Sequence, residues 1–449
     1  MQVAEKTYLN YIDLLRLDNW SVPGLLDATF NYSNQFPLLR IGDFLIKNRN
    51  VINIDDDITY KRVTVRINNN GVFLRDTQKG VNIGTKKQYL VKSGQFIVSK
   101  IDARNGAFGI IPEVLNGAIV TNDFPLYDVD TKKINPRFLL LITTTTEFIG
   151  FAQSCSSGTT NRQRMDMDMF LNQRIPLPNI EEQEKIVKNY YSKIEEAQNL
   201  SKQANDLESE IEEYLFEELG VYKNLGSGMK KGIQTIDFSN IDKWSIDDIF
   251  KKNTINSYKY DLTSLNSICT LITDGTHQTP KYFDNGIIFL SAKNVTKEII
   301  DWTDVKYVSK EAHLEYIKRV KPEIDDILLA KNGTTGIAAI VDDDREFSIY
   351  VSLALLKPDR KSIFPRYLLH LINSDIARIQ FSSRLIGIGV PNLHLGEIRE
   401  VVIPLPNIDM QINISKYIDN IKTKVKKIQE KVEQLKAHAK TEFEQTIFR

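Results

Sequence analysis

The chain has 449 residues, in which 58 lysines and arginines balance 58 aspartates and glutamates, and 42% of the residues are hydrophobic. This length predicts two to four domains. Cys155 and Cys269 are the only cysteines, which excludes a disulfide framework and leaves too few thiols for a structural zinc site. No apolar stretch follows the N-terminus and no apolar run is long enough to cross a bilayer, so we expect a soluble, cytoplasmic protein without a membrane partner.

The sequence repeats itself. Residues 175–180 read Ile-Pro-Leu-Pro-Asn-Ile and recur as residues 403–408, and a glutamine follows each copy at the same offset (Gln183 and Gln411). Further landmarks return after 224 to 231 residues: Trp20-Ser21 as Trp244-Ser245, Pro136-Arg137-Phe138-Leu139 as Pro365-Arg366-Tyr367-Leu368, and, more loosely, Lys100 and Gly109 as Lys331 and Gly336. This period predicts a tandem duplication of one globular domain followed by one long helix.

We therefore expect a first globular domain at 1–178, a central helix at 179–220, a second globular domain at 221–406 and a C-terminal helix at 407–449. Both domains should be β-rich with scattered helices, because branched and aromatic runs alternate with clusters of Gly, Asn and Asp. Strands are expected at 64–67, 96–99 and 109–111, and at 287–290, 327–329 and 337–341. A short helix is expected after each Pro-Arg-aromatic-Leu landmark, at 136–151 and 365–381, and 226–231 has the composition of a flexible linker.

Each Ile-Pro-Leu-Pro segment is expected to be the last strand of its domain and to run into the cap of a long helix. In the first copy Asn179 is a suitable N-cap, Glu182 completes a capping-box pattern and Gly220 stops the helix. The second copy has Asp409-Met410 where the first has two glutamates, so its capping box is lost, at a cost of about 1 kcal/mol.

The C-terminal helix carries apolar residues in alternating steps of four and three, the pattern of a coiled-coil seam. Its members are Ile414, Ile418, Ile421, Val425, Ile428, Val432, Leu435 and Ala439. The central helix has a similar stripe with one three-residue slip, made of Ile186, Tyr190, Ile194 and Ala197, then Leu200, Ala204, Leu207, Ile211 and Tyr214. Residues 181–219 carry a net charge of −8 and residues 412–449 one of +4, so we expect the helices to pair antiparallel and to relate the domains by a pseudo-twofold axis. The alternative is that each helix folds back onto its own domain.

Polar loops at matching places in the two domains are candidate recognition surfaces. Arg, Lys, Asn and Gln read base edges, and Lys, Arg and Thr hold phosphates. The loops are 86–88, 100–106 and 158–164 in the first domain, and 273–280, 293–294, 331–336 and 390–394 in the second. Any one loop is equally well explained as an ordinary solvated turn, and it is the set that favours a recognition face.

These features resemble the specificity subunit of type I restriction–modification enzymes. The resemblance rests on the twice-occurring IPLPNI, continued once by Glu181-Glu182-Gln183 as in the family pattern PLP-x-x-EQ, on the long helix after each copy, and on loop motifs at 274–280, 326–333 and 158–164. It implies an α+β protein with two β-rich target-recognition domains separated by two long helices paired as an antiparallel coiled coil. Each domain would read one half of a bipartite site in double-stranded DNA. The helices would set the spacer and dock two methyltransferase subunits.

The resemblance also implies that this chain is non-catalytic and holds no cofactor. S-adenosylmethionine, ATP and Mg²⁺ are then expected on partner subunits, including restriction (translocase) subunits where the system has them. The sequence contains no Pro-Pro dipeptide, and so no Asn/Asp-Pro-Pro-Tyr motif of an amino-methyltransferase, and no G-x-x-x-x-G-K-[ST] or H-x-x-x-H motif. A nuclease built from scattered carboxylates, or a self-contained methyltransferase, stays open as a third interpretation.

The expected DNA contacts in the first domain are Lys86, Lys87, Lys100, Arg104, Asn105, Thr160, Arg162, Gln163 and Arg164. In the second domain they are Thr276, His277, Thr279, Lys293, Asn294, Lys331, Asn332 and Asn392. The net charge of the second domain argues against DNA binding. Residues 220–411 are neutral overall, whereas DNA-binding domains usually have an excess of basic residues. We expect the cations to gather on one face and the methyltransferase subunits to add affinity. The main competing interpretation is a coiled-coil scaffold whose β-rich domains bind proteins.

Overall fold

The computed structural model describes residues 32–48, 50–157, 163–224, 254–385 and 392–448, together with residues 232, 235, 237 and 238. The two Trp-Ser landmarks and the 226–231 segment lie outside the described residues. The chain forms two compact units, of which unit 1 contains Met1–Asn199 with Lys431–Arg449 and unit 2 contains Leu200–Glu430. The expected boundaries treated each long helix as a separate segment, whereas both units include part of each helix.

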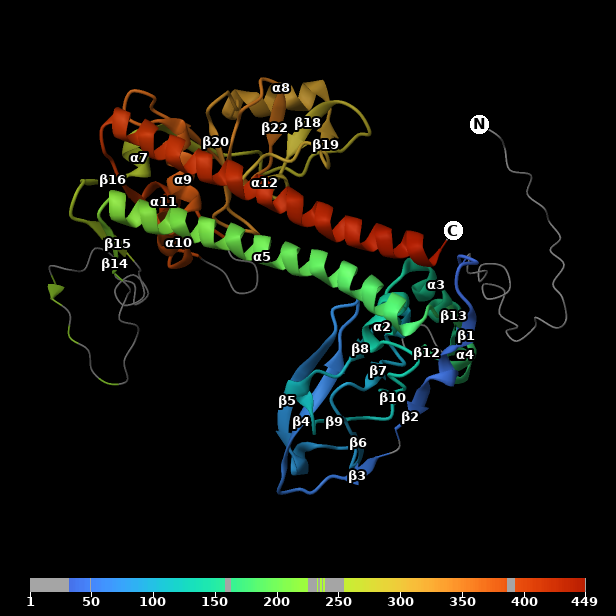
Figure 1. Cartoon of the computed structure of the whole chain (residues 1–449). Helices are drawn as coiled ribbons and strands as arrows, with labels where there is room; N and C mark the ends of the chain where they lie inside the picture. Colours follow the sequence, from blue (N-terminus) through green and yellow to red (C-terminus); the bar gives the residue numbers. More distant parts are fainter. Residues whose placement is uncertain are drawn as a thin grey trace, which may run out of the picture. The chain divides into compact units, whose positions relative to one another are not determined.

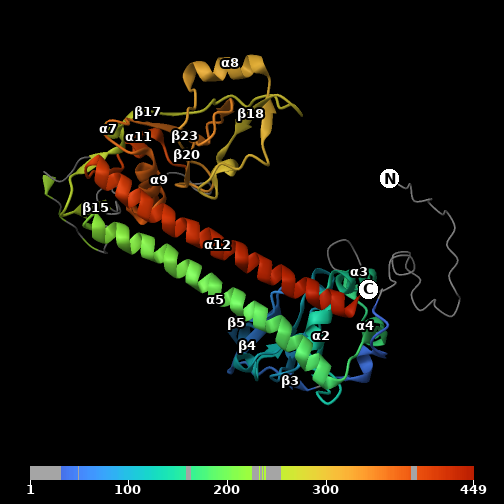
Figure 2. The ribbon, with the colours of Figure 1, turned by 45° about the horizontal axis from the view of Figure 1, so that its top comes forward.

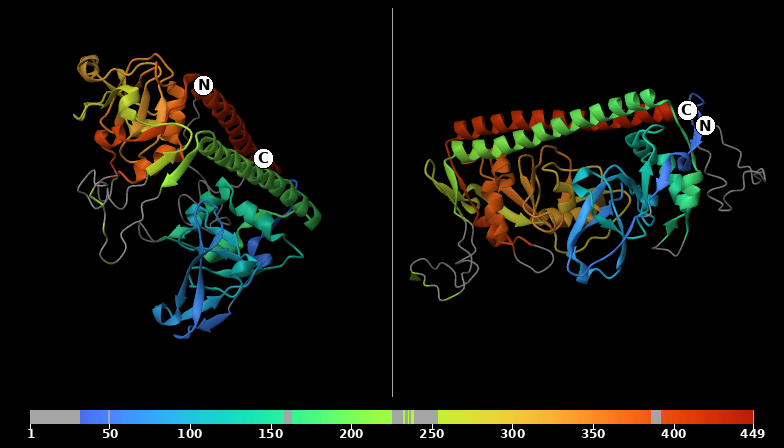
Figure 3. Two further views of the ribbon diagram at one scale, coloured as in Figure 1. Left: turned by 90° about the vertical axis from the view of Figure 1, so that its left-hand side faces the viewer. Right: turned by 60° about the horizontal axis from the view of Figure 1, so that its bottom comes forward.

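The long helices are α5 (Ile180–Glu218) and α12 (Ile408–Ile447), which lie side by side and run antiparallel (Figure 1, Figure 2 and Figure 3). In unit 1 the start of α5 contacts the end of α12, where Glu442 accepts a hydrogen bond from Asn189 at 2.6 Å and pairs with Lys193 at 2.7 Å. In unit 2 the end of α5 contacts the start of α12, where Tyr417 donates to Glu210 at 2.7 Å. The predicted antiparallel pairing is confirmed.

The predicted seam of α12 is buried along its length, with only Ile428 and Leu435 reaching half-burial. Burial of each large aliphatic side chain stabilises the fold by roughly 1.5–3 kcal/mol. The start of this seam also covers a domain, since Ile414 and Ile418 belong to the core of unit 2. At the start of α5, Val187, which is not part of the predicted stripe, belongs to the core of unit 1. Each helix packs on the domain before it at its start, whereas its far end contributes to the other core, as Leu215 of α5 does in unit 2 and Phe443 of α12 does in unit 1. The helices therefore do not each fold back onto their own domain.

The glutamine that follows each Ile-Pro-Leu-Pro segment is fully buried and fastens the helix to its domain. Gln183 accepts a hydrogen bond from the Asn135 amide at 2.8 Å and donates to the Pro178 carbonyl at 2.8 Å. Gln411 repeats this arrangement, accepting from the Phe364 amide at 2.8 Å and donating to the carbonyl just before its own helix. A buried amide satisfied on both sides fixes the backbone around it, which explains why the same residue recurs at the same offset.

The predicted helix ends are also found. Asn179 caps α5 by accepting a hydrogen bond from the Glu182 amide at 2.9 Å, and Asn407 caps α12 by accepting from the Met410 amide at 2.9 Å. The second helix therefore keeps its N-cap although it lacks the acidic partner of a capping box. Gly220 follows the end of α5 with φ of 61°, a left-handed conformation that favours glycine.

The described residues of unit 1 form four sheets. The strand before α5, β13 (Arg174–Pro176), pairs with β1 (Leu38–Arg40). The largest sheets are a four-stranded one in the order β2 (Leu45–Lys47), β10 (Leu126–Val129), β7 (Phe96–Val98), β8 (Phe108–Ile110), and a five-stranded one in the order β3 (Val51–Asn53), β6 (Lys87–Leu90), β9 (Ile119–Val120), β4 (Thr59–Val65), β5 (Val72–Lys79). A short pair, β11 (Ser156–Ser157) and β12 (Arg164–Met165), completes the described strands.

Unit 2 contains a corresponding strand before its helix, β24 (Val402–Pro404), paired with β16 (Leu262–Ser264). Its four-stranded sheet has the order β17 (Cys269–Asp274), β23 (Leu353–Pro358), β20 (Ile327–Ala330), β21 (Ala338–Ile340). A three-stranded sheet has the order β19 (Lys306–Val308), β18 (Ile287–Leu290), β22 (Phe347–Ile349), and β14 (Val221–Asn224) pairs with β15 (Thr254–Ser257). The six predicted strands are all found, although β4 ends at Val65 and extends no further into 64–67.

The two four-stranded sheets share one topology, in which the strands stand in the order first, fourth, second, third along the chain. The second strand of each is followed by a lysine at an equivalent site. The amide of Lys100 donates to the Asp123 carbonyl at 2.9 Å, and the amide of Lys331 donates to the Ser352 carbonyl at 3.0 Å. These shared features confirm the internal repeat.

One predicted landmark is misaligned. Gly109 lies inside β8 and pairs with Ile97, so it is not the counterpart of Gly336. The strand registers instead place Gly336 at the position of Gly106, and both glycines have left-handed φ values of 92° and 76°. The backbone conformation of the turn, which glycine favours, is what the repeat preserves here.

The helix expected after each Pro-Arg-aromatic-Leu landmark is in fact two helices. Unit 1 has α2 (Pro136–Thr143) and α3 (Thr146–Ser154), and unit 2 has α9 (Pro365–Asn373) and α10 (Asp375–Ser382). Hydroxyl side chains cause the breaks, because Thr145 accepts a hydrogen bond from the Phe148 amide and Ser374 accepts one from the Ile376 amide, so that each starts a new helix. The other short α-helices in the described part of the chain are α4 (Met167–Asn172), α7 (Leu265–Ile268), α8 (Lys310–Arg319) and α11 (Leu395–Arg399).

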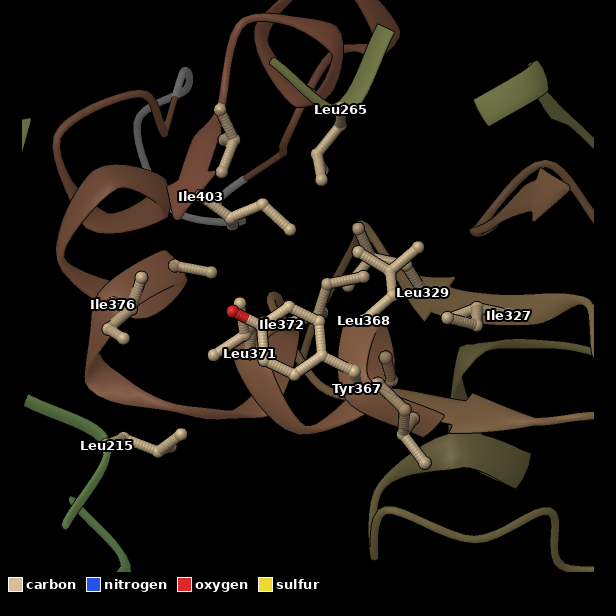
Figure 4. Packing of buried hydrophobic residues seen from close by; sticks show 14 of the residues in the cluster. Leu215, Leu265, Ile327, Leu329, Tyr367, Leu368, Leu371, Ile372, Ile376 and Ile403 are labelled. Atoms are coloured by element: carbon tan, nitrogen blue, oxygen red, sulfur yellow. The ribbon is translucent and has the colours of Figure 1, made fainter. Parts of the chain in front are cut away.

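The core of unit 2 joins the repeated landmarks to one another. Tyr367 of α9 is fully buried and donates a hydrogen bond to the Pro404 carbonyl of β24 at 2.9 Å. Figure 4 shows Ile403 of β24, Leu215 of α5 and Leu329 of β20 around residues of α9, and all belong to one hydrophobic cluster. The last strand, the landmark helix and the long helices are thus held by a single core.

Candidate nucleic-acid interface

In unit 1 the loop after β7 and the segment around β12 form one polar surface. The carbonyl of Lys100 accepts a hydrogen bond from the Met165 amide at 2.9 Å. The loop then turns through a short 3-10 helix at Ala103–Asn105. Arg104 donates from Nη1 to Gln163 Oε1 at 2.8 Å, which joins the two segments through their side chains as well. The structure therefore brings together the predicted contacts Lys100, Arg104, Asn105, Gln163 and Arg164.

Arg164 has an acidic partner that DNA could replace. Its guanidinium donates to both carboxylate oxygens of Asp123, at 3.0 and 3.3 Å. The two side chains are 50% and 35% exposed. An exposed pair of this kind contributes about 0–1 kcal/mol, whereas an arginine–phosphate contact is bidentate and charge-assisted. A DNA phosphate can therefore take the place of Asp123 at small cost.

The tip of the hairpin formed by β4 and β5 supports the same loop and was missed in the sequence. Its Asn68 amide donates to the Asn105 carbonyl at 2.7 Å, and its Asn69 amide donates to the Gly106 carbonyl at 3.1 Å. Both asparagines have φ of 58°, which non-glycine residues adopt rarely. The exposed Arg66 at the base of this tip lies 4.2 Å from the Phe73 ring, so the hairpin adds a cation to the surface. The only sequence signal was the turn-like run of asparagines at 68–70 before Gly71.

The remaining predicted contacts of unit 1 are placed differently. Lys87 begins β6 in the five-stranded sheet and Lys86 directly precedes it, and both side chains are exposed. The ammonium of Lys86 pairs with Asp56 and donates to the Gly80 carbonyl at 2.8 Å. Thr160 and Arg162 lie outside the described residues.

In unit 2 the candidate site is organised around Asp274, the last residue of β17. This buried carboxylate accepts hydrogen bonds from Lys331 Nζ at 2.8 Å and from Arg319 at 2.7 Å, and His277 Nε2 lies 3.2 Å away. Lys331 is almost as buried as Asp274, whereas Arg319 and His277 are exposed. One buried acid therefore fixes a guanidinium and an imidazole at the surface.

Electrostatics keep Asp274 ionised. Burial acts to raise the pKa of this carboxyl, but the hydrogen bond and charge of Lys331, together with His277, outweigh burial and lower the pKa below its ordinary value. Lys331 is itself 8% exposed at its side chain. The direct DNA contact expected for Lys331 does not fit this position, because its ammonium is already committed to Asp274. Arg319 at the end of α8 was missed, since nothing in the spacing links it to a carboxylate 45 residues earlier.

The turn after Asp274 presents the predicted residues Thr276, His277 and Thr279. Gly275 permits this turn, because a Cβ at that position would lie 2.0 Å from the Ile349 carbonyl oxygen. The Thr276 amide donates to the same carbonyl at 3.1 Å. His277 and Thr279 are exposed and Thr276 is half-buried, which leaves all three side chains in reach of a ligand.

Lys293 and Asn294, which are adjacent in sequence, have different roles. Lys293 is exposed and pairs with Asp304 at 3.1 Å. Asn294 is buried, accepts a hydrogen bond from the Ser291 amide at 3.0 Å and donates to the carbonyls of Asp301 and Asp304. Its side chain therefore holds a loop in shape, and the expected DNA contact by Asn294 does not fit.

Asn332 and Asn392 lie opposite each other in a short antiparallel bridge. Next to it, the Leu393 amide donates to the Lys331 carbonyl at 2.9 Å. This bond is the counterpart of the one between Met165 and Lys100, so the two asparagines occupy the same place in unit 2 as the Lys100 surface occupies in unit 1. Their amide oxygens have no hydrogen-bond donor among the residues that the structure describes.

Among residues 32–448 apart from the gaps given above, no three His, Cys, Asp or Glu side chains gather as metal ligands would. None of the helices in the described part of the chain is long and apolar enough to cross a membrane.

Both repeated parts of the chain are similar to known proteins. Residues 37–208 and 245–437 each match the type I restriction modification DNA specificity domain. The EcoBI type I restriction enzyme specificity subunit of Escherichia coli is 26% identical over 184 residues, which are 39% of this chain and 39% of that protein. The MjaVIII specificity subunit of Methanocaldococcus jannaschii is 25% identical over 296 residues, which are 64% of each chain. The chain thus matches less than two thirds of the length of both relatives.

A similar fold is found in a solved chain from a structural study of complex assembly and conformational transition in the type I R-M system. The likeness covers 94% of this chain and 99% of that chain, with a TM-score of 0.54 and 18% sequence identity. At this identity the likeness concerns the fold alone.

Proposed function

The chain belongs to the type I restriction modification DNA specificity family, and on this premise we propose that it is the DNA sequence-specificity subunit of a type I restriction–modification complex. Each β-rich domain then reads one half of a bipartite site in double-stranded DNA. The chain itself is non-catalytic in this proposal and works in the cytoplasm.

One observation carries the proposal. Two four-stranded sheets of the same topology each hold a polar loop after their second strand, anchored by the same pair of backbone hydrogen bonds. The side chains of the two loops differ. A repeated scaffold with different loops is what two related modules need in order to read two different sequences, because base-edge contacts give specificity and the scaffold fixes their position.

The proposed DNA contacts are exposed or half-buried side chains of the segments described above. In unit 1 they are Arg66, Lys100, Arg104, Asn105, Gln163 and Arg164, with Lys86, Lys87, Thr160 and Arg162 as further predicted contacts. In unit 2 they are Thr276, His277, Thr279, Lys293, Arg319, Asn332 and Asn392. Asp274 and Lys331 position two of them, and Asn294 shapes the loop of a third.

The long helices are proposed to set the spacer between the half-sites and to dock two methyltransferase subunits. At about 1.5 Å per residue, each helix is roughly 60 Å long, and their mutual packing makes them a stiff pair. S-adenosylmethionine, ATP and Mg²⁺ belong to the partner subunits, which include restriction subunits where the system has them.

The experiment is to co-express the chain with its methyltransferase subunit and to map methylated bases across the host genome. The expected motif has two specific half-sites separated by a spacer of fixed length. Arg104→Ala with Gln163→Ala should relax one half-site only, and His277→Ala with Arg319→Ala should relax the other only. Lys132→Ala, an exposed lysine of unit 1 outside both the long helices and the proposed contacts, is the matched control and should leave the motif unchanged.

An unsplit motif, or methylation that does not depend on this chain, would refute the proposal. A gel shift with and without the methyltransferase subunit separates it from the competing function. If no DNA is shifted even by the complex, while other proteins bind the β-rich domains, the chain is a protein-binding scaffold instead.

A further inference from the structure

Unit 2 contains a cavity of about 380 Å³ whose walls are aromatic and whose rim is basic. Tyr282, Phe289 and Tyr350 line it together with Lys293 and Lys306. Phe289 is 2% exposed and forms the buried wall, with the rings of Tyr282 and Tyr350 each 6.1 Å from it. Tyr282 is 38% exposed, so one wall of the cavity reaches solvent. The volume lies at the lower end of the range for small-molecule sites.

The chemistry of these walls suits a nucleobase. Every base has a π-face that stacks on aromatic side chains, and cationic side chains beside the stack hold the phosphate. Lys306 places its ammonium 4.0 Å from the centre of the Tyr282 ring. Lys293 pairs with Asp304, whose carboxylate is 82% exposed, and an exposed partner is easily replaced by phosphate.

Two hydroxyl groups could read the edge of the base. Ser352 Oγ accepts a hydrogen bond from the Ala292 amide at 3.0 Å, which leaves its own hydroxyl proton to donate into the cavity it lines. Ser291 also lines the cavity. A stacking wall with a few polar groups is the arrangement that pockets for extruded bases use.

The cavity is continuous in structure with the candidate interface. Tyr350 follows β22, and its amide donates to the Leu290 carbonyl of β18 at 2.9 Å. The next amide, from Val351, donates to the Thr276 carbonyl at 3.0 Å, which ties the aromatic wall to the turn that carries His277. Lys293 belongs to both the cavity and the predicted set of DNA contacts.

We propose that this cavity binds a single nucleobase, stacked against Tyr282, with Lys293 and Lys306 holding the attached phosphate. The occupant is a base of the bound DNA that has left the helical stack, and a free deoxynucleotide has the same chemistry. This proposal extends the proposed function. That the occupant is a base of the bound DNA rests on the proposed function.

The test uses the complex of the full chain with its methyltransferase subunits and duplexes carrying its methylated motif. An abasic site replaces each base of the unit 2 half-site in turn, and affinity is measured for the wild type and for Tyr282→Ala. At one position the two changes should be non-additive, with a coupling of roughly 5- to 150-fold, because each removes one partner of the same stack. Tyr258→Ala, an exposed tyrosine of unit 2 that does not line the cavity, is the control and should be additive everywhere.

A second arm titrates the chain with the four deoxynucleoside monophosphates. One outcome is that the monophosphates bind the wild type but not Tyr282→Ala, while the abasic sites and Tyr282→Ala have additive effects on DNA affinity at every position. The cavity is then a nucleobase pocket whose ligand is a free nucleotide. Additivity at every position without nucleotide binding would overturn the proposal, even while the wild-type complex binds its motif. If the wild-type complex binds no DNA, the proposed function fails, and the nucleotide titration alone then decides the pocket.

Discussion

Asp274→Asn is expected to destabilise unit 2 strongly, because it removes the charge that balances a buried lysine. The carboxylate lies 2.8 Å from Lys331 Nζ, and both side chains are under 10% exposed. Breaking a buried pair by removing one partner typically costs about 3–5 kcal/mol, since the other charge is left uncompensated. Glu315→Gln is the matched control: its pair with Lys318 is exposed on both sides and should contribute about 0–1 kcal/mol.

Hydrogen exchange measures this effect locally, which is necessary because a chain of two units need not unfold in one step. Protection of β17 and β20 should fall in Asp274→Asn and stay unchanged in the control. Replacing both partners, with Asp274→Leu and Lys331→Met, should recover most of the loss, since an apolar pair leaves no charge unpaired. Equal protection in Asp274→Asn and in the control would refute the reasoning.

The pH dependence of the same variant has a defined sign. The pKa of Asp274 is lowered in the folded chain from its ordinary value of 3.8, so the unfolded state binds the proton more readily than the folded state. The contribution of the carboxylate is therefore complete above about pH 5 and is lost as pH falls through the lowered pKa. The difference in the free energy of unfolding of unit 2 between the wild type and Asp274→Asn should be constant near neutral pH and should become smaller in acid.

Three further changes test other parts of the structure. Gln411→Ala should lower the free energy of opening at the start of α12, measured by hydrogen exchange, by about 2–4 kcal/mol, because it strands buried backbone groups there, whereas the exposed Gln429→Ala should be near neutral. Ile418→Ala should cost about 2–5 kcal/mol by opening a cavity at a fully buried site, and an equal loss in the exposed Lys427→Ala would contradict this. Arg164→Gln should reduce the slope of log affinity against log salt by about 1, measured by fluorescence anisotropy on the target duplex, and an unchanged slope would show that Arg164 neutralises no phosphate.

The parts of the fold that were predictable are those that leave a periodic or repeated signal. The α12 seam recurs every seven residues because one face of the helix is buried throughout, and Gln183 and Gln411 recur because each fastens a helix to its domain with the same hydrogen bonds. The helix breaks at Thr145 and Ser374 leave no periodic or repeated signal, so the sequence did not predict them. A hydroxyl that ends one helix and starts another differs from an ordinary helical residue only through its local hydrogen bond.

The candidate site was predicted less completely, because its geometry depends on contacts distant in sequence. Arg319 comes to Asp274 from a different helix, and the hairpin tip at Asn68 comes to the loop at Asn105 from a different sheet. Lysines and asparagines were predicted to contact DNA because of their side-chain chemistry, but the residue type does not determine whether the side chain is exposed. Asn294 is polar and suited to base contacts, but its amide is used inside its own loop.

The comparison of Lys100 with Lys331 shows how one scaffold can carry two specificities. Both residues stand at the same site after the second strand, held by amide and carbonyl hydrogen bonds that do not depend on the side chain. In unit 2 the Lys331 side chain is buried on Asp274, which also holds Arg319, whereas in unit 1 Lys100 is only half-buried and the nearby acid, Asp123, holds Arg164. Because the backbone bonds fix the loop, its side chains are free to change without loss of the fold. Exchange of the exposed loop residues should therefore alter specificity at little cost in stability, whereas a buried pair such as Asp274 and Lys331 has to change together.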